Sequence, residues 1–568
     1  MNRKFWTNPV FYISAVFIFI LVVLGAAKPA PFGKVSERLY HFTTDNFGWF
    51  YLLAVFIVIV FLVGLAISKF GAIRLGGDTE RPEYPFFTWI GMLFSAGFGV
   101  GLVFWGVAEP MSHYFKSPLA SVEAQTEEAA RVAMGYSFFH WGISQWAIFG
   151  MVGLVIGFLQ FRKKKDGLIS TALEPLIGSN RHVKTGIDSF AVVATVMGIA
   201  TSLGMGVLQM SGGLEYVFDI KSTFTVQLII IAVVFVAYMT SAASGLGKGI
   251  AYLGNFNLGM AIALLVFFFI VGPKVFILET FTLAIGDYIN NFITYSLRLQ
   301  PYQGGTWVKD WTIFYWAWTI AWSPFVGAFV ARVSKGRTIR EFIMGVMVIP
   351  PAFSCMWIAT LGGTALYSDL RNGTQIAQEV DQDVTSAIFA TLQQLPMTNI
   401  VSFLAIVLIF TFLITSADSA TYILASMTMR GSLFPPLVVK FIWGFLMTAI
   451  AAVLLSAGGL EALQSASLVS ALPFTLFLLL LMFSLGKLLA REPITVRPTD
   501  IRQFEHVEGE VKKRRKRKES EKERRMRREK EKARKAKEKS DKKYQELEKK
   551  KYMEYEKEKE QKKGQDDE

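Results

Sequence analysis

Residues 95–101 read Ser-Ala-Gly-Phe-Gly-Val-Gly, with glycine at every second position of an otherwise apolar stretch. The stretch lies within a candidate membrane span at about 87–107, where each glycine costs roughly 1 kcal/mol of helix propensity relative to alanine. Unpaired backbone at membrane depth is tolerated only where protein or a water-filled cavity covers it. The run therefore predicts a break in a membrane helix, at a depth where a binding site can form.

Many further apolar stretches surround this one. A helix that crosses the hydrocarbon core needs roughly 20 mostly apolar residues, so we expect an all-α polytopic membrane protein. Twelve spans are predicted, near 8–27, 47–68, 87–107, 136–160, 188–215, 224–244, 254–279, 312–332, 341–366, 398–418, 433–457 and 465–490. The first is not read as a cleavable signal, because its apolar run is long and eleven spans follow. An amphipathic, interfacial element is expected at about 280–298.

A second interruption is predicted in the eighth span. Pro324 lies inside an apolar helix there, where proline removes one backbone hydrogen bond and frees carbonyl groups. The two interrupted spans are five apart, so spans three to seven and eight to twelve form two candidate five-helix repeats, the second inverted. This arrangement is typical of alternating-access transporters with a site at the midplane. The alternative is that the glycines simply let helices pack closely.

The same reading divides the chain into five parts. Two N-terminal helices come first, then the first repeat, an interfacial connection, the second repeat and a charged tail. The expected bounds are 1–86, 87–280, 281–311, 312–490 and 491–568.

Composition excludes several classes of protein. The chain is 52% hydrophobic and 18% charged, which is too apolar for a soluble enzyme. One cysteine and five scattered histidines predict no intrachain disulfide and no transition-metal centre. No nucleophile–base constellation appears, so the protein is not expected to be an enzyme.

Basic residues predict the orientation. The loops after spans two, four and eight are rich in Lys and Arg, which are retained on the cytoplasmic side, so both termini are expected inside. These cations are Lys69, Arg74 and Arg81 in the first loop, Arg162 and Lys163 to Lys165 in the second, and Arg332, Lys335, Arg337 and Arg340 in the third.

Residues 491–568 form a tail that holds 30 Lys or Arg and 21 Asp or Glu. This composition cannot bury a core, so the tail is either disordered or an exposed single helix held by Glu–Lys pairs. Seven consecutive cations are expected to bind anionic lipid and to make the tail a salt-sensitive regulator. A topology anchor or a solubilising extension is the alternative, and nucleic acid is not an expected partner. The seven are Lys512, Lys513, Arg514, Arg515, Lys516, Arg517 and Lys518.

Aromatic residues gather in two spans and suggest what is carried. Trp141, Trp146 and Phe149 lie in the fourth span, and Trp318 and Trp322 share one face of the eighth. Rings that face a desolvated cavity attract a quaternary ammonium, at about 2 kcal/mol or more for a good contact. The alternative is an interfacial aromatic belt.

These residues and their surroundings resemble the betaine/choline/carnitine transporters. The similarity covers SAGFGVGLVFWGVAEP (95–110), FHWGISQWAIF (139–149), ATSLGMGVLQM (200–210), YWAWTIAWSPFVGAFVARVSKGRTIR (315–340) and FLITSADS (412–419). The resemblance implies a leucine-transporter-like inverted repeat preceded by two extra helices, usually a trimer, and substrates that carry an onium group.

The family's aromatic box maps onto this chain with two departures. Phe149 stands where betaine transporters usually have tyrosine, and Thr319 replaces a tryptophan that often completes the box. Thr319 offers a hydroxyl instead of a ring, which makes a smaller zwitterion such as glycine an alternative. The substrate-binding residues implied are Trp141, Trp146, Phe149, Trp318, Thr319 and Trp322, with the backbone at Gly97, Gly99 and Gly101 for the carboxylate.

The resemblance also implies a sodium ion, as the coupling ion and with no other cofactor. Its ligands would come from the broken third helix and a Thr-Ser pair in the tenth: Ser95, Phe98, Phe412, Thr415 and Ser416. The alternative is that these hydroxyls bond their own backbone. A second sodium position would need two threonines on the fifth span, whereas this chain has Thr195 but Ile199.

The leading hypothesis is a sodium-coupled symporter that imports glycine betaine or a similar zwitterionic osmolyte across a bacterial plasma membrane. The alternatives are an importer of a smaller zwitterion, a sodium-independent exchanger, and a transporter-like sensor that signals through its tail.

Overall fold

The computed structural model describes residues 8–97, 99–244, 249–302, 304–432, 434–492 and 498–563. These residues are helical with connecting segments, and the only β pairing among them is an isolated bridge between Arg74 and Thr338. The chain forms two compact units, Met1–Glu492 and Pro493–Glu568, which we describe separately.

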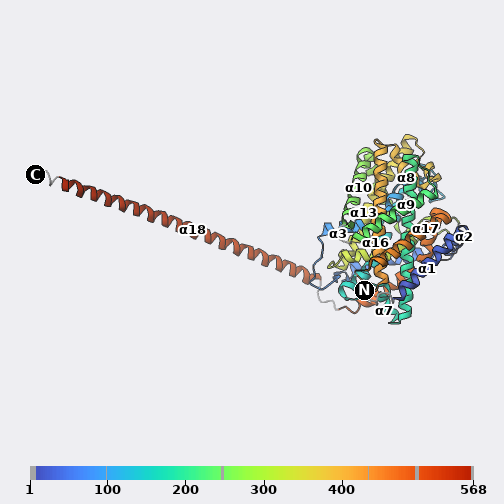
Figure 1. Ribbon diagram of the computed structural model, residues 1–568, viewed down its shortest axis with the longest axis horizontal. Helices are drawn as coiled ribbons and strands as arrows, with labels where there is room; N and C mark the ends of the chain where they lie inside the picture. Colours follow the sequence, from blue (N-terminus) through green and yellow to red (C-terminus); the bar gives the residue numbers. More distant parts are fainter. Residues whose placement is uncertain are drawn as a thin grey trace. The chain divides into compact units, whose positions relative to one another are not determined.

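The body contains seventeen α-helices in its described part, together with short 3-10 and π segments (Figure 1). The α-helices are α1 (Pro9–Ala27), α2 (Pro29–Ile67), α3 (Phe86–Gly97), α4 (Val100–Phe115), α5 (Glu127–Trp141), α6 (Ile143–Gly157), α7 (Ile169–Ile177), α8 (Arg181–Phe218), α9 (Phe224–Ser244), α10 (Gly249–Val271), α11 (Lys274–Ser296), α12 (Phe314–Val333), α13 (Ile339–Asn372), α14 (Ile376–Gln382), α15 (Ala387–Gln393), α16 (Thr398–Thr428) and α17 (Leu437–Leu489). The π segments are Phe158–Arg162 and Lys309–Ile313, and the 3-10 segments are Lys69–Ala72 and Val384–Ser386.

Ten helical stretches in the described part of the chain are long and apolar enough to cross a membrane. This confirms the polytopic all-α class, and the difference from twelve has a local cause. The third predicted span is divided into α3 and α4, each too short to be counted. The eleventh and twelfth are continuous in α17, across a kink at Gly458 and Gly459. Twelve spans and the inverted repeat stay predictions.

The seventh span ends earlier than predicted. Helix α10 stops at Val271 and α11 begins at Lys274, because Pro273 cannot continue the first helix. The interfacial element expected at 280–298 is therefore the later part of a 23-residue helix, and the predicted boundary near residue 280 is wrong. The second span also differs, since α2 starts at Pro29 rather than near residue 47.

The glycine run interrupts the third span as predicted. Helix α3 ends at Gly97, and Gly99 caps α4 with an extended backbone (φ −124°, ψ −168°). A break that was not predicted occurs at Gly142, between α5 and α6. Backbone groups that such interruptions leave unpaired are tolerated at membrane depth only where protein or a water-filled cavity covers them.

The predicted interruption at Pro324 is wrong. Helix α12 runs through the proline without leaving helical geometry. A proline at this position leaves the Ile320 carbonyl without its usual partner, and the Ser323 hydroxyl donates to that oxygen at 2.7 Å. The residue just before the proline therefore supplies the hydrogen bond that the ring removes.

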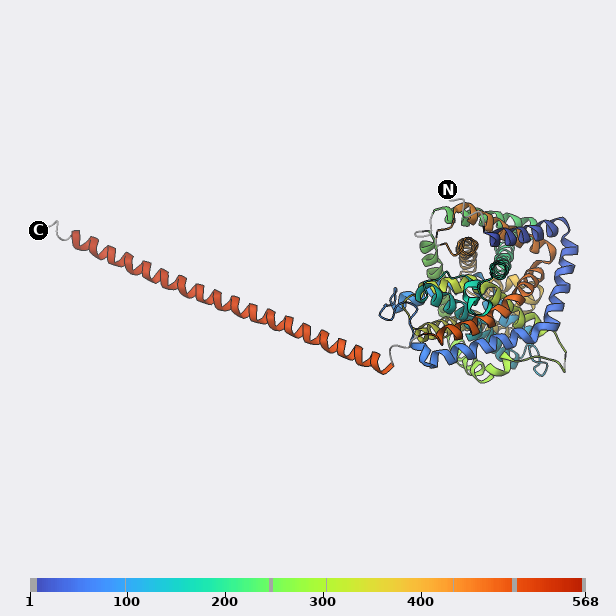
Figure 2. The ribbon, with the colours of Figure 1, turned by 90° about the horizontal axis from the view of Figure 1, so that it is seen from below.

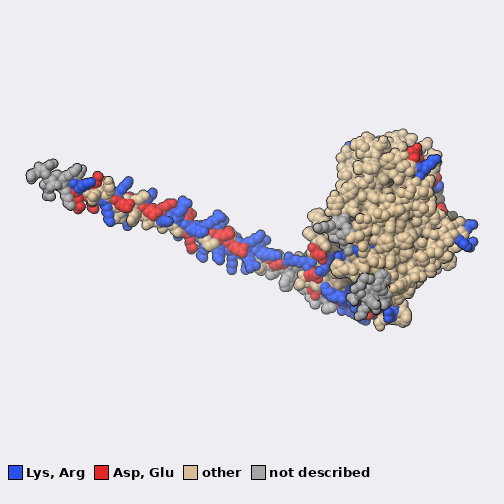
Figure 3. All heavy atoms as spheres, viewed as in Figure 1, with Lys and Arg blue, Asp and Glu red and all other residues tan. Residues whose placement is uncertain are grey.

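Burial separates inner from outer helices. The most apolar windows of α5–α6, α8 and α12 are 94%, 89% and 89% buried, whereas those of α1, α9 and α10 are 28%, 33% and 28% buried. The outer helices expose large apolar side chains, as expected for a surface that faces lipid. The face of the body seen in Figure 3 accordingly shows few charged residues outside its edges. The candidate site lies among the inner helices.

The second unit contains one helix, α18 (Pro498–Lys563). It is single and continuous in Figures 1 and 2, and every side chain from Glu510 to Lys559 is exposed. Ion pairs one helical turn apart stabilise it, including Glu508–Lys512 at 2.8 Å and Glu531–Lys535 at 3.1 Å. Of the two predicted alternatives for the tail, the structure has the exposed single helix, with both signs of charge mixed along it (Figure 3).

Candidate substrate and ion site

The five predicted aromatic residues form one continuous buried surface. Trp141 ends α5, Trp146 and Phe149 lie on α6, and Trp318 and Trp322 lie on α12. Their ring centroids follow one another at 6.2 Å (Trp141–Trp318), 6.2 Å (Trp318–Trp322), 6.1 Å (Trp322–Phe149) and 5.7 Å (Phe149–Trp146). All five are at most 7% exposed, which argues against an interfacial belt for these particular rings.

The start of α4 lies directly against this aromatic surface. A methyl group added at Gly101 would lie 2.5 Å from Cη2 of Trp318 and 3.4 Å from Cη2 of Trp141. One added at Gly99 would lie 3.5 Å from Cη2 of Trp322. Glycine at 101 is therefore what lets the backbone approach the rings. Gly97 is the last residue of α3, on the other side of the break.

Two polar groups of the aromatic surface have no hydrogen-bond partner among the residues that the structure describes. The Thr319 hydroxyl and the Trp322 indole nitrogen are buried without a hydrogen bond, whereas Trp318 Nε1 donates to Ser202 Oγ at 3.1 Å. A small cavity of about 20 Å³ lies beside Trp322 and Ser202. Buried polar groups that lack a partner cost about 1–3 kcal/mol each, so these two groups are suited to bind a polar solute.

The predicted sodium residues on α16 lie beside the same break. Thr415, Phe412 and Gly99 line one cavity of about 30 Å³, and Ser416 lines the neighbouring one with Gly101. Ser95 lies in α3, and Phe98 lies outside the described residues.

The Thr415 hydroxyl already has partners. It donates toward the Thr411 and Phe412 carbonyls, at 3.1 and 3.0 Å, and accepts from Asn257 Nδ2 at 3.0 Å. The alternative that this hydroxyl bonds its own backbone is therefore visible in the structure. The Thr195 hydroxyl does the same with the Ala191 carbonyl at 2.7 Å.

A buried carboxylate behind the aromatic surface was missed by the sequence analysis. Glu109 on α4 accepts from Trp141 Nε1 at 2.8 Å and from the Tyr315 hydroxyl at 2.6 Å, and it lies 2.6 Å from His140 Nδ1. The available signal was an acid inside an apolar helix, but Glu109 lay two residues beyond the predicted end of its span. His140 has partners on both ring nitrogens, Glu109 Oε1 on Nδ1 and Thr312 Oγ1 at 2.9 Å on Nε2.

Three other acids in or near the spans, Asp418, Glu215 and Asp219, form local hydrogen bonds or cap a helix. Asp418 lies within α16 and is 1% exposed. Its carboxylate accepts from the Ser241 hydroxyl at 2.5 Å. Glu215 accepts from the Ser222 backbone just beyond α8, and Asp219 caps that helix.

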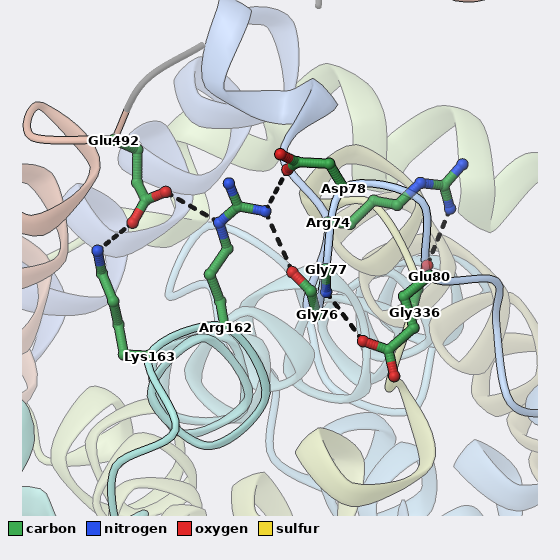
Figure 4. A network of polar contacts seen from close by, with 9 residues as sticks. All are labelled: Arg74, Gly76, Gly77, Asp78, Glu80, Arg162, Lys163, Gly336 and Glu492. Carbon is green, nitrogen blue, oxygen red and sulfur yellow. Dashed lines mark hydrogen bonds and ion pairs between the residues drawn. The ribbon is translucent and has the colours of Figure 1, made fainter. Parts of the chain in front are cut away.

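The three basic loops form one polar network, of which Figure 4 shows the centre. Arg162 donates to Glu492 at 2.9 Å, to Asp78 at 2.6 Å and to the Gly76 carbonyl at 3.1 Å, and Lys163 pairs with Glu492. The predicted cytoplasmic loops therefore lie together and contact the end of the body. Burial opposes ionisation of Glu492, but hydrogen bonds from Lys163 and Arg162 outweigh it and hold the pKa of this carboxyl below its ordinary value.

Backbone contacts join the first and third of these loops. Arg74 donates to the Gly336 carbonyl at 2.9 Å, and the Leu75 backbone N–H donates to the Arg337 carbonyl at 2.8 Å. Gly336 has a positive φ of 81° and packs against the Arg81 carbonyl, which leaves no room for a side chain. The pKa of Glu80 is below its ordinary value because its carboxylate accepts from the Gly77 backbone and from Lys335.

The fold defines a multi-pass membrane protein, and the buried aromatic surface is its candidate site for a small molecule. The model of the betaine/carnitine/choline family transporters (BCCT) matches residues 9–494. The chain belongs to this family, whose members are transporters and not enzymes.

Curated relatives cover nearly the whole body. The ectoine/hydroxyectoine transporter of Virgibacillus pantothenticus is 62% identical over 491 residues, which is 86% of this chain and 98% of the relative. The glycine betaine transporter OpuD of Bacillus subtilis is 46% identical, over 85% of this chain and 95% of the relative. A probable glycine betaine transporter of Desulfitobacterium hafniense is 45% identical, over 85% and 97%.

Proposed function

We propose that this protein imports a small zwitterionic osmolyte of the ectoine or betaine type, coupled to sodium, across a bacterial plasma membrane. The single observation that carries the proposal is the continuous aromatic surface packed against the helix break at Gly99 and Gly101. Such rings bind a delocalised or onium cation in a desolvated site, and the exposed backbone of a broken helix suits the carboxylate of the same solute.

The polar groups on this surface favour an ectoine-type solute over glycine betaine. The amidinium ring of ectoine carries N–H donors, whereas the trimethylammonium of betaine carries none. The free Thr319 hydroxyl can accept from such a donor. The free Trp322 Nε1, three residues further along the same helix, can donate to a carboxylate. The 62% identity to an ectoine/hydroxyectoine transporter points the same way. A smaller zwitterion such as glycine is a third candidate.

Uptake into proteoliposomes tests the proposal. We expect radiolabelled ectoine to accumulate when sodium is higher outside, and unlabelled ectoine to compete better than glycine betaine, choline, carnitine or glycine. Accumulation that is equal with and without a sodium gradient would favour the exchanger, and binding without any uptake would favour the sensor.

Thr415 and Ser416 are the proposed sodium ligands on α16, with further oxygen atoms from the α3–α4 break. Hydroxyl and carbonyl oxygens are the ligands that a hard cation requires. Replacing either residue by alanine should raise the sodium concentration for half-maximal uptake about tenfold. Thr411→Ala is the matched control, because its hydroxyl bonds only carbonyls of the same helix in the described structure. An equal rise in the control would remove the assignment.

The charged tail is the proposed regulator, and anionic lipid is its proposed partner. Lys512 to Lys518 present seven cations on an exposed helix, each worth about 1 kcal/mol near an anionic surface and weakened by salt. Truncation before Lys512 should reduce activation of uptake by internal salt while leaving basal uptake intact. Unchanged activation would leave the topology anchor as the better explanation.

Alternating access and a homotrimer complete the proposal. The outer helices α1, α9 and α10 expose broad apolar faces, so subunit contacts and lipid both have surface available. Mass measurement of the detergent-solubilised protein distinguishes a trimer from a monomer.

A further inference from the structure

Behind the aromatic surface lies a second cluster, which the transport of a zwitterion does not by itself require. Glu109 and His113 lie one turn apart on α4, and His140 lies at the end of α5. All three side chains are 0% exposed, and their nearest oxygen and nitrogen atoms lie within 4.8 Å of one another. In the described part of the chain the ion pairs of Glu109 involve only these two histidines.

Donors hold the carboxylate from one side. Glu109 Oε2 accepts from Trp141 Nε1 and the Tyr315 hydroxyl, while Oε1 faces both imidazoles, at 2.6 Å from His140 Nδ1 and 3.3 Å from His113 Nε2. With both rings neutral the cluster carries one negative charge, and one added proton makes it neutral. A single buried charge is unfavourable at membrane depth, so proton uptake, which neutralises the cluster, is favoured by the surroundings.

The partners of the histidines suit either state. His140 Nε2 lies 2.9 Å from Thr312 Oγ1, and a hydroxyl can donate to a neutral ring or accept from a protonated one. Among the described residues neither ring nitrogen of His113 has the geometry of a hydrogen bond, but Nε2 lies 3.3 Å from Glu109 Oε1, so a second buried base faces the same carboxylate oxygen. The cluster can therefore hold or release one proton without creating a new unpaired group at His140.

The cluster connects two places where its charge would matter. Trp141 donates to Glu109, and its ring contacts Trp318 of the aromatic surface. On the other side, His113 packs against Trp307 and Trp311, at 5.0 and 4.4 Å between centroids. Both tryptophans line a cavity of about 710 Å³, which gives protons a short route to the cluster.

Few other ionisable groups face the cluster. The ring centroid of Tyr136 on α5 lies 6.4 Å from that of His113. The ring of Tyr315 on α12 stacks on His140, with the centroids 4.8 Å apart. Arg298 after α11 lies over the rings of Tyr136 and Trp307 and donates to the Tyr136 hydroxyl. The more distant charges line the large cavity: Asp310 of the π segment, Lys116 beyond α4 and Asp381 of α14.

We propose that Glu109, His113 and His140 form a binding site for one proton, which competes with the cationic head of the solute at the aromatic surface. The unprotonated cluster is negative and favours the solute's positive charge, and the protonated cluster is neutral. Solute binding therefore releases a proton, and by reciprocity acid weakens solute binding. This inference rests on the proposed function for its solute, but the titration of the cluster itself does not.

The test is solute binding to the purified full-length protein between pH 5.5 and 8.5, at saturating sodium. We expect the Kd for radiolabelled ectoine to rise about three- to tenfold per pH unit on the acid side, the limit for one competing proton being tenfold. A pH indicator in weak buffer should report up to one proton released per solute bound. In Glu109→Gln both effects should disappear. The control variant Asp188→Asn should keep them, because Asp188 is a buried carboxylate outside the cluster that accepts from the Ser170 hydroxyl.

A second variant and a solute-free measurement keep the proposal testable. Tyr315→Phe removes one donor to the carboxylate, so the midpoint of the pH dependence should move to higher pH. Without solute, tryptophan fluorescence should titrate in the wild type and not in Glu109→Gln, because a protonated histidine next to Trp141 and Trp307 quenches indole emission.

Several results would overturn the proposal. These are a Kd that is flat with pH, a slope that survives in Glu109→Gln, and a transition metal found by elemental analysis in the wild type and lost in Glu109→Gln. Absence of binding for every osmolyte at every pH would instead contradict the proposed function, and the solute-free titration would still decide the proton site.

Discussion

Alanine at position 101 is the sharpest perturbation of the aromatic surface that the structure offers. The added methyl carbon would lie 2.5 Å from Cη2 of Trp318, whereas carbon atoms in contact are separated by about 3.5–4.0 Å. The indole would have to retreat by about 1 Å, and it is held on several sides. Trp318 stacks on Phe314 and Trp322, with centroids at 5.9 and 6.2 Å, and donates to Ser202.

The expected magnitude follows from overpacking of a tight interior. Such insertions cost about 1–3 kcal/mol, which corresponds to roughly 5- to 150-fold in an equilibrium constant. We expect the Kd for ectoine to rise at least about tenfold in Gly101→Ala, because the methyl group occupies the face that the solute needs. Helix stability should not fall on account of propensity, since alanine is favoured over glycine by about 1 kcal/mol inside a helix such as α4.

Gly99→Ala is the matched control. Its added methyl lies 3.5 Å from Trp322 Cη2 and 3.7 Å from Ser416 Oγ, which is ordinary contact, and its φ of −124° suits alanine. We expect less than about a threefold change in Kd, on the same scale of packing energies. Equilibrium binding and uptake of both variants, with thermal unfolding to verify folding, make the comparison. Wild-type binding by Gly101→Ala, or equal losses in the two variants, would refute the reasoning.

Three further predictions concern single side chains. Ser323→Ala leaves the Ile320 carbonyl beside Pro324 without its donor and should lower the melting temperature, at a cost of about 1–3 kcal/mol; an unchanged melting temperature would contradict the role given to this hydroxyl. Thr319→Val removes the free hydroxyl and should weaken ectoine binding about fivefold, the effect of about 1 kcal/mol, while glycine betaine binding stays the same; equal losses for both solutes would argue against the specificity role. Because the pKa of Glu492 is lowered in the folded protein, its ion pairs stabilise the fold above the unfolded pKa of about 4.3, and that contribution is lost as pH falls through the folded value. The difference in melting temperature between wild type and Glu492→Gln should therefore be present in full at pH 7, begin to shrink as pH falls to about 4.3, and vanish only below the lowered folded pKa. A difference that is constant with pH would count against the pairing.

The length and position of apolar runs predicted most of the helices, because hydrocarbon thickness sets how many apolar residues a span needs. Breaks were harder to predict. The glycine run at 95–101 was recognised correctly, but the break at Gly142 has only one glycine as its signal, and a single glycine inside a helix is common. Pro324 gave the opposite error, since the compensating hydroxyl of Ser323 acts through a rotamer that the sequence does not display.

The aromatic residues of the candidate site could be selected from the sequence because rings at helical spacing in two spans have few other uses at that depth. Their buried partners could not. Glu109 meets His140, Trp141 and Tyr315 only because α4, α5 and α12 converge, and no pattern within one helix encodes that convergence. The residue roles proposed for solute and sodium stay predictions until binding is measured.

Helix α18 has a mechanical consequence for any charge sensor built from it. At about 1.5 Å per residue its 66 residues extend about 100 Å, while electrostatic forces in physiological salt decay over about 8 Å. A flexible chain could bring its charges to a surface a few at a time. A stiff rod either lies along the surface, with tens of charges inside the ionic atmosphere at once, or tilts away and withdraws nearly all of them. Binding of such a rod to a charged surface would then change steeply over a narrow range of ionic strength, rather than gradually.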